Sequence, residues 1–129
     1  MSQEIRFLLI NGSCDHYWRE VLEEVLAPLG TLEVSREEEA IKLVLLSSYD
    51  LILVDATAVG NVPLLVARIR AQRPEARIVV ATASPTWARA REAFQSGATD
   101  YIRKSLNREE ILSAVQTALV KILPPWPPR

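Results

Sequence analysis

The sequence has only one cysteine, Cys14, among its 129 residues, so no disulfide can form within the chain. This cysteine usage is typical of a reducing compartment, and we expect a cytoplasmic protein. No apolar run reaches the ~18 residues that a membrane-spanning helix requires, so no membrane partner is expected. An acidic residue precedes the first short apolar run, and a small-residue cleavage pattern is missing. This start predicts a strand rather than a signal peptide.

Neither sign of charge is in excess. The 15 Lys and Arg side chains nearly balance 16 Asp and Glu side chains, for a net charge of -1. This balance excludes a basic surface spread over the whole protein, and direct binding to nucleic acid is not expected. A local group of arginines is interpreted as a solvated face around the end of the third predicted helix. It consists of Arg68, Arg70, Arg73 and Arg77.

Motifs of nucleotide-binding and nucleophilic enzymes are also missing. The sequence holds no GxGxxG loop, no Walker loop, no CxxC pair and no Ser–His pairing signal. Its single histidine, His16, has no partner at metal-ligand spacing, although Cys14 and Asp15 stand next to it. A metal role for His16 is therefore not expected.

What the sequence does have is an alternation of short apolar runs with amphipathic segments. The runs at 5–10, 51–54 and 78–81 carry apolar residues at successive positions, which is typical of parallel strands buried on both faces. Weaker strand patterns lie at 31–34 and 101–102. The crossovers are ~20 residues or fewer, so the strands are predicted to be parallel with right-handed connections.

Helical periodicity fills the segments between the strands, and boundary residues mark where each helix begins or ends. The predicted signals are Gly30 closing the first helix, a capping box of Ser35 with Glu38, an end before Pro74, a start at Ser84–Pro85, an end at Gly97, a capping box of Asn107 with Glu110, and a stop near Leu123. The result is a three-layer α/β/α sandwich over residues 1–123, followed by a proline-rich tail at 124–129.

Polar side chains stand at the carboxyl ends of several predicted strands, where parallel sheets bind ligands. Asn11 and Gly12 end the first strand, Asp55 the third and Thr82 the fourth, and the fifth runs into Lys104. A carboxylate, a hydroxyl and an ammonium group at one edge suit acyl-phosphate formation. In that chemistry the carboxylate attacks a phosphoryl donor while the other two groups bind phosphoryl oxygens.

Three segments resemble the receiver domain of bacterial response regulators. YDLILVD at 49–55 resembles the strand that carries the phosphoaccepting aspartate, and ARIVVATA at 76–83 the strand that ends in the switch hydroxyl. GATDYIRKS at 97–105 resembles the family's Gly-Ala-x-x-Tyr-x-x-Lys-Pro segment. The resemblance covers nearly the whole chain and implies a flavodoxin-like five-stranded parallel sheet in the order 2-1-3-4-5.

The resemblance also implies roles for single residues. Asp55 matches the phosphoacceptor, Thr82 the switch hydroxyl, Tyr101 the switch aromatic and Lys104 the phosphate-binding lysine. Family members take a phosphoryl group from a histidine kinase or phosphotransfer protein, use Mg²⁺, and are not enzymes in their own right. They present the face formed by helix four, strand five and helix five to a downstream protein partner. On this face we predict Trp87 and Tyr101 as the partner surface, and a homodimer is left open.

The departures from the family concern the metal. Receivers usually end the first strand with two acidic residues that bind Mg²⁺, whereas this chain has Asn11-Gly12, so Mg²⁺ binding is expected to be weak or absent. The remaining candidate ligands are Asp55, the backbone carbonyl of Thr57, and Asn11 or Asp15. Asp15 has the alternative role of capping the first helix. Without the acidic pair, Asp55 and Lys104 are expected to pair directly.

Another departure is Ser105, which replaces the proline after the lysine and makes a cis peptide bond costly, by ~3 kcal/mol. Three functions follow from these observations. The first is a receiver phosphorylated on Asp55, and the second is a pseudo-receiver that binds partners without phosphorylation. The third is a flavodoxin-like domain that binds a small molecule through the first loop, for which the sequence at 11–13 offers only a faint glycine-containing signal.

Overall fold

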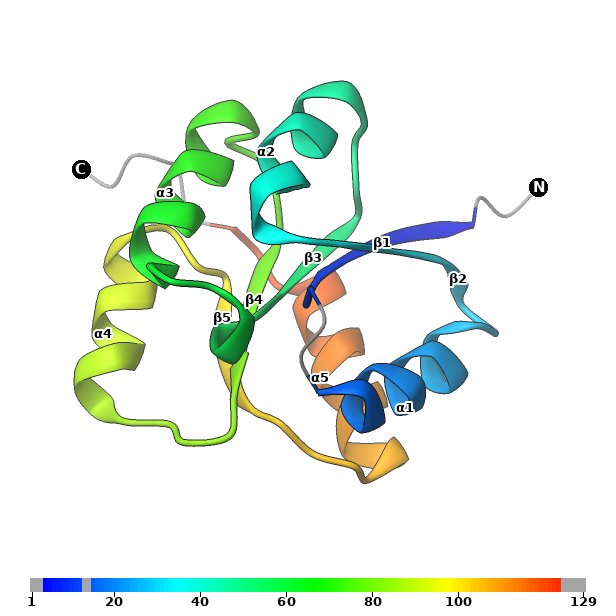
Figure 1. The fold of residues 1–129 in the computed structure, drawn as a ribbon. Helices are drawn as coiled ribbons and strands as arrows, with labels where there is room; N and C mark the ends of the chain where they lie inside the picture. The colour runs from blue at the N-terminus through cyan, green and yellow to red at the C-terminus, as the bar shows by residue number, and fades with distance from the viewer. Residues whose placement is uncertain (1–3, 13–14, 124–129) are drawn as a thin grey trace.

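A five-stranded parallel sheet forms the middle of the molecule (Figure 1). The computed structural model describes residues 4–12 and 15–123. The strands are β1 (Ile5–Ile10), β2 (Gly30–Ser35), β3 (Leu51–Asp55), β4 (Ile78–Thr82) and β5 (Asp100–Arg103). Every neighbouring pair is parallel, and the order is β2-β1-β3-β4-β5. The predicted fold class and strand order are confirmed.

Helices cover both faces of the sheet (Figure 1). They are α1 (His16–Leu26), α2 (Glu37–Leu46), α3 (Val62–Gln72), α4 (Trp87–Gln95) and α5 (Arg108–Val120), with a short 3₁₀ turn, η1 (Ala56–Ala58). One core cluster lies between the sheet and the helices α2, α3 and α4, and the other between the sheet and α1 and α5. None of these helices in the described residues is long and apolar enough to cross a membrane.

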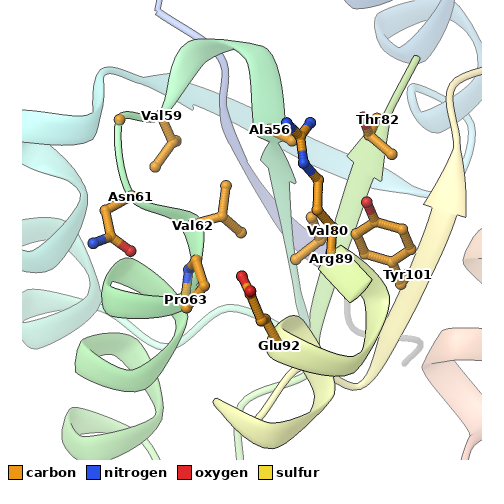
Figure 2. A pocket seen from close by; sticks show the side chains of 11 residues that line it. Ala56, Val59, Asn61, Val62, Pro63, Val80, Thr82, Arg89, Glu92 and Tyr101 are labelled. Atoms are coloured by element: carbon orange, nitrogen blue, oxygen red, sulfur yellow. The ribbon is translucent and has the colours of Figure 1, made fainter. Parts of the chain in front are cut away.

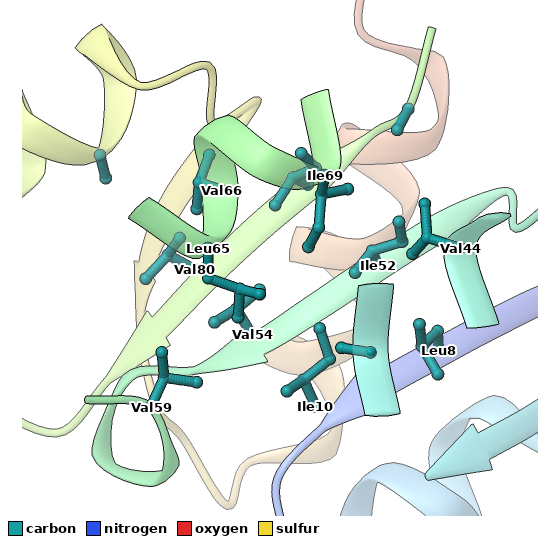
Figure 3. Packing of buried hydrophobic residues seen from close by; sticks show 14 residues of the cluster. Leu8, Ile10, Val44, Ile52, Val54, Val59, Leu65, Val66, Ile69 and Val80 are labelled. Atoms are coloured by element: carbon teal, nitrogen blue, oxygen red, sulfur yellow. The ribbon is translucent and has the colours of Figure 1, made fainter. Parts of the chain in front are cut away.

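The alternation of side chains along each strand builds the two cores. In β1 and β3, Leu8 and Ile52 face α2 and α3 (Figure 3), whereas Leu9 and Leu53 face α1 and α5. All four are at most 1% exposed. Full burial of one such side chain stabilises the fold by about 1.5–3 kcal/mol, which is why the central strands are apolar at every position of 7–10 and 51–54.

The prediction that Gly30 closes α1 is wrong. The helix ends at Leu26, and Gly30 is the first residue of β2, paired with Ile5 of β1. A Cβ atom at Gly30 would lie 1.9 Å from the backbone oxygen of Ile5. Glycine is therefore required here by the close approach of two strands rather than by a helix end.

Two predicted helix starts are also wrong. Ser35 is the last residue of β2, and α2 begins after Arg36 without a side-chain cap. Three glutamates in its first turn interact favourably with the positive end of the helix dipole instead. In α4 the cap is Thr86, whose hydroxyl accepts from the Arg89 N–H, so Ser84–Pro85 lies in the preceding loop.

The remaining boundaries follow the sequence signals. The backbone after α4 turns at Gly97 with a φ of 113°, and Asn107 Oδ1 accepts from the N–H of Glu110. The helix α3 ends two residues before Pro74, and α5 ends at Val120, near the predicted Leu123. The proline-rich tail at 124–129 lies outside the described residues.

The predicted solvated arginine face is wrong for all but Arg68. Arg70 is 4% exposed and donates to the backbone oxygen of Gly97. Arg73 donates to the carbonyl of Val44, and Arg77 to that of Ala118, near the carboxyl ends of α2 and α5. Carbonyls at helix ends have no partner within the helix, so arginines from a neighbouring segment satisfy them.

Candidate functional site

Asn11 and Asp55 meet because β1 and β3 are parallel neighbours that end at the same edge of the sheet. Ile10 pairs with Val54, so the next residue along each strand comes side by side. Lys104 arrives from the other side, after β5, and its backbone N–H donates to the carbonyl of Thr82. The strand register therefore places a carboxylate, an amide and an ammonium group at one point.

The Asp55 carboxylate is fully buried and fully engaged. Its exposed fraction is 0%. Oδ1 accepts from the Thr57 N–H at 2.9 Å, and Oδ2 accepts from Asn11 Nδ2 at 2.7 Å. Lys104 Nζ lies 2.8 Å from Oδ1 and 2.9 Å from Oδ2. Each oxygen thus has two partners, the number that its lone pairs accommodate. The predicted direct pairing of Asp55 with Lys104 is confirmed.

Lys104 joins two acidic residues rather than one. Its Nζ also donates to Asp15 Oδ2 at 3.0 Å and lies 5.0 Å from the centre of the buried Trp18 ring. Burial alone lowers the pKa of Lys104, but the hydrogen bonds to Asp55 and Asp15 outweigh it and raise the pKa above its ordinary 10.5. The ammonium group is therefore charged at neutral pH and acts as the resident cation of the site.

Asp15 has the capping role that the sequence offered as one alternative, and it also binds Lys104, which the sequence did not predict. Its Oδ1 accepts from the Trp18 N–H and caps α1, while its Oδ2 binds Lys104. The backbone of Asp15 is left-handed, with a φ of 42°, a conformation that Asp and Asn adopt more readily than most residues. Burial raises the pKa of Asp15, but the bonds from Lys104 and Trp18 lower it by more, to below 3.8.

Among the described residues, the side chains of Thr82 and Tyr101 form no hydrogen bond with this cluster, although the Thr82 carbonyl accepts from the Lys104 N–H. Thr82 is 5% exposed, and its Oγ1 accepts from the Ser84 N–H. Together with the half-buried Tyr101, it lines a cavity of about 390 Å³ beside α4 (Figure 2). Trp87 lines neither place and is 92% exposed at the start of α4. The structure thus divides the predicted residues among an Asp55–Lys104 cluster, a cavity and an exposed aromatic side chain.

The sequence profile of the response regulator receiver domain matches residues 15–116. The chain belongs to this family. Receiver domains act in two-component signalling and interact with histidine kinases or phosphotransfer proteins. They are signalling modules rather than enzymes. No curated protein matches the chain significantly.

Solved structures give the same fold. A two-component response regulator from Clostridium difficile is 28% identical over 91% of this chain and 96% of its own, with a TM-score of 0.77. A response regulator from Burkholderia pseudomallei, solved with a phosphorylated aspartic acid, a calcium ion and citrate, is 27% identical over 90% of this chain and 69% of its own, at a TM-score of 0.75. An orphan response regulator of H. pylori, 24% identical over 89% of this chain and 96% of its own at a TM-score of 0.77, supports the fold alone.

Receiver domains usually bind Mg²⁺ at an acidic site, and the residues of this receiver do not fit that ion as they are arranged. Both oxygens of Asp55 and both of Asp15 already have donors. The unengaged oxygen is Asn11 Oδ1, which is buried without a hydrogen-bond partner. Turning the amide would set this oxygen against the Asp55 carboxylate. This amide oxygen and the backbone carbonyl of Thr57 are both neutral, and neutral oxygens alone are not enough for Mg²⁺, which prefers one or two carboxylates. No group of three or more metal-ligating side chains occurs within the described ranges.

Sequence reasoning missed several residues around this site. Trp18, three residues after the Asp15 cap, packs beneath Lys104, and its only signal was helical spacing from Asp15. Arg89 and Glu92 of α4 line the cavity with Tyr101. Both residues are exposed, and nothing in the sequence places them opposite the loop before α3.

Replacement of Asp15 by Asn is expected to lower the free energy of unfolding by no more than about 1 kcal/mol at neutral pH, because Asp15 is partly exposed and its pair with Lys104 is screened. Asn caps helices as well as Asp and tolerates the left-handed backbone, so only the ion pair is lost. Since the folded pKa of Asp15 lies below 3.8, its contribution is present above that pH and is lost as the pH falls through the lowered pKa.

Urea unfolding of the Asp15→Asn variant at several pH values measures this loss. The variant is expected to approach the original protein in stability as the solution becomes strongly acidic. Asp15→Ala serves as the control, because it also removes the cap and should cost about 1 kcal/mol more at every pH. If the free energies of unfolding of the Asp15→Asn variant and the original protein differ by the same amount at every pH, the ion pair with Lys104 contributes nothing to stability.

Proposed function

We propose that this receiver domain signals without phosphorylation of Asp55, as a protein-interaction module within a two-component system. The observation that carries the proposal is that the Asp55 carboxylate is buried and fully hydrogen-bonded. Its carboxylate is 0% exposed and has a donor on every lone pair, one of which is the ammonium group of Lys104. Asp55 is neutralised within the protein, so no added cation is needed to stabilise this state.

The chemistry of phosphoryl transfer supports the same conclusion. An attacking carboxylate needs a free lone pair in line with the phosphoryl group, and positive charge must offset the charge that develops there. At this site Lys104 would first have to leave Asp55, because it covers both oxygens. The Asn11-Gly12 pair supplies no carboxylate to hold another cation beside it. Both requirements disfavour a reactive Asp55.

Phosphorylation of Asp55 is the second candidate, supported by the presence of Asp55, Thr82 and Lys104 at neighbouring strand ends. The similar Burkholderia pseudomallei response regulator was solved with a phosphorylated aspartic acid. In this alternative, Lys104 releases Asp15 and binds one phosphoryl oxygen while the Thr82 hydroxyl binds another. The change would then reach partners through α4, β5 and α5.

Intact-mass measurement after incubation with acetyl phosphate or phosphoramidate, with and without Mg²⁺, separates the two candidates. We expect no phosphoryl adduct under either condition, while a typical receiver treated in parallel is labelled. An adduct that disappears in the Asp55→Asn variant would overturn the proposal and establish the second candidate. The isosteric Asn at position 55 keeps the carbonyl oxygen and removes the nucleophile.

The Gly12→Asp variant extends the same experiment. A Cβ atom at Gly12 meets no atom within 4 Å, and Asp tolerates the backbone φ of 61° there better than most residues do, although with some strain. This variant returns one acidic residue to the end of β1. If the missing acid accounts for the inactivity, Mg²⁺ affinity and labelling of Asp55 should rise together.

The proposed partner surface is the exposed side of α4. Trp87 is 92% exposed and Phe94 is 44% exposed, and aromatic side chains of this kind often anchor protein interfaces. A downstream protein or a second copy of the chain would bind this surface. The Trp87→Ala variant is expected to lose binding to this protein or second copy while its thermal stability stays unchanged.

A further inference from the structure

The cavity beside α4 is a feature that Asp55 chemistry does not explain. It measures about 390 Å³, within the roughly 300–1,000 Å³ typical of small-molecule sites. Figure 2 shows it between the loop before α3 and the helix α4, over the ends of β4 and β5. Neither Asp55 nor Lys104 lines it. The cavity is therefore a separate place in the molecule, although Ala56, the residue after Asp55, lines it.

The walls of this cavity are built from two kinds of side chain. Val59, Val62 and Val80 give it an apolar side, and Val59 and Val80 are themselves buried. Arg89 and Glu92 give it one positive and one negative charge. Small-molecule sites commonly combine such an apolar lining with a few polar groups that converge on the ligand.

The two charges face different ends of the cavity. In Figure 2 the guanidinium of Arg89 lies toward Ala56 and Thr82, whereas the carboxylate of Glu92 lies toward Val62 and Pro63. A pair at positions i and i+3 of a helix is close enough to form an ion pair on the surface. Within the part of the chain that the structure describes, neither side chain has an ion-pair partner. Both charges are thus available to a ligand.

Hydroxyl groups supplement the positive end. Tyr101 points its hydroxyl into the cavity beside Arg89 (Figure 2). Thr82 lines the same end, and its Oγ1 accepts from Ser84, which leaves its proton for another acceptor. An arginine with two hydroxyl donors is a suitable arrangement for a carboxylate, since the guanidinium binds both carboxylate oxygens in one plane.

We propose that this cavity binds a small amino carboxylate whose carboxylate and ammonium groups are separated by an apolar chain. Arg89 and the hydroxyl of Tyr101 bind the carboxylate, and Glu92 accepts hydrogen bonds from the ammonium group. The chain between the two charges packs against Val59 and Val62. Binding is non-covalent, and the cavity shares no charged residue with the Asp55–Lys104 cluster.

Such a ligand would connect the loop before α3 with α4. Because Trp87 stands in the first turn of α4, a ligand that fixes this helix also fixes the exposed aromatic surface. Ligand binding in the cavity would therefore affect the proposed partner surface in addition to any effect of Asp55.

A homologous series of amino carboxylates tests the proposal, with the spacing of the two charges as the variable. The probes are glycine, β-alanine, γ-aminobutyrate, δ-aminovalerate and ε-aminocaproate, titrated into the full chain by calorimetry. We expect saturable binding with the highest affinity at one intermediate or long member and little binding of glycine. Arg89→Gln and Glu92→Gln should each weaken that affinity about tenfold or more, as expected for a lost charge-assisted hydrogen bond.

Arg91→Gln is the matched control, because Arg91 is exposed on the same helix and does not line this cavity. It should retain the original affinity. Binding of no probe at millimolar concentration would overturn the proposal, as would equal affinities in Arg89→Gln and Arg91→Gln. Acetate alone binding as well as the best probe would show that Glu92 has no role, and would overturn the assignment of a zwitterion.

Discussion

Replacement of Lys104 by methionine is expected to lower the free energy of unfolding by about 3–5 kcal/mol, because it leaves a buried carboxylate without its cation. Asp55 is 0% exposed, and Lys104 Nζ lies within 2.9 Å of both its oxygens. Methionine matches the apolar stem of lysine, so packing against the Trp18 ring is largely kept. Urea unfolding followed by circular dichroism measures the change.

The double variant Asp55→Asn with Lys104→Met separates charge from packing. Asparagine removes the buried charge and keeps an oxygen for the Thr57 N–H, so most of the lost stability should return. A loss below about 1 kcal/mol in Lys104→Met would contradict the resident-cation role. So would a loss that remains the same size when Asn replaces Asp55.

Replacement of Arg70 by methionine is the second large effect, expected to cost about 2–4 kcal/mol through buried carbonyls left without donors. Arg70 donates to the carbonyls of Gly97, Pro74 and Ala76, and so joins α3 to the segments that precede β4 and β5. Burial lowers the pKa of Arg70 below its ordinary value, but a guanidinium remains charged at neutral pH. Thermal and urea unfolding measure the cost.

Arg68→Met is the matched control, since Arg68 is exposed on the same helix and should change stability by less than about 0.5 kcal/mol. Arg70→Lys should recover little of the loss, because an ammonium group lacks the planar fork that reaches several carbonyls. Equal effects of methionine at positions 68 and 70 would show that the buried hydrogen bonds of Arg70 do not stabilise the fold.

Much of the fold was predictable from the sequence because its signals are local. The apolar runs of β1, β3 and β4 can be buried only on both faces of a sheet, and short crossovers force those strands to be parallel. The predictions failed where a boundary depends on a distant segment. Gly30 is required by Ile5 of another strand, which no local pattern around Gly30 reveals.

The candidate site was likewise predictable only in part from the sequence. The sequence alone determined that Asp55 and Thr82 stand at strand ends, since each follows directly from an apolar run, and that Lys104 follows a weaker strand pattern. It also determined that the acidic pair before α1 is missing. Only the tertiary structure decided what these residues contact. Strand order brings Lys104 between Asp55 and Asp15, which are far apart in the chain, and buries the Asp55 carboxylate completely. The exposed side chains of Arg89 and Glu92 line a cavity that no local pattern in α4 reveals, because the opposite wall comes from the loop before α3.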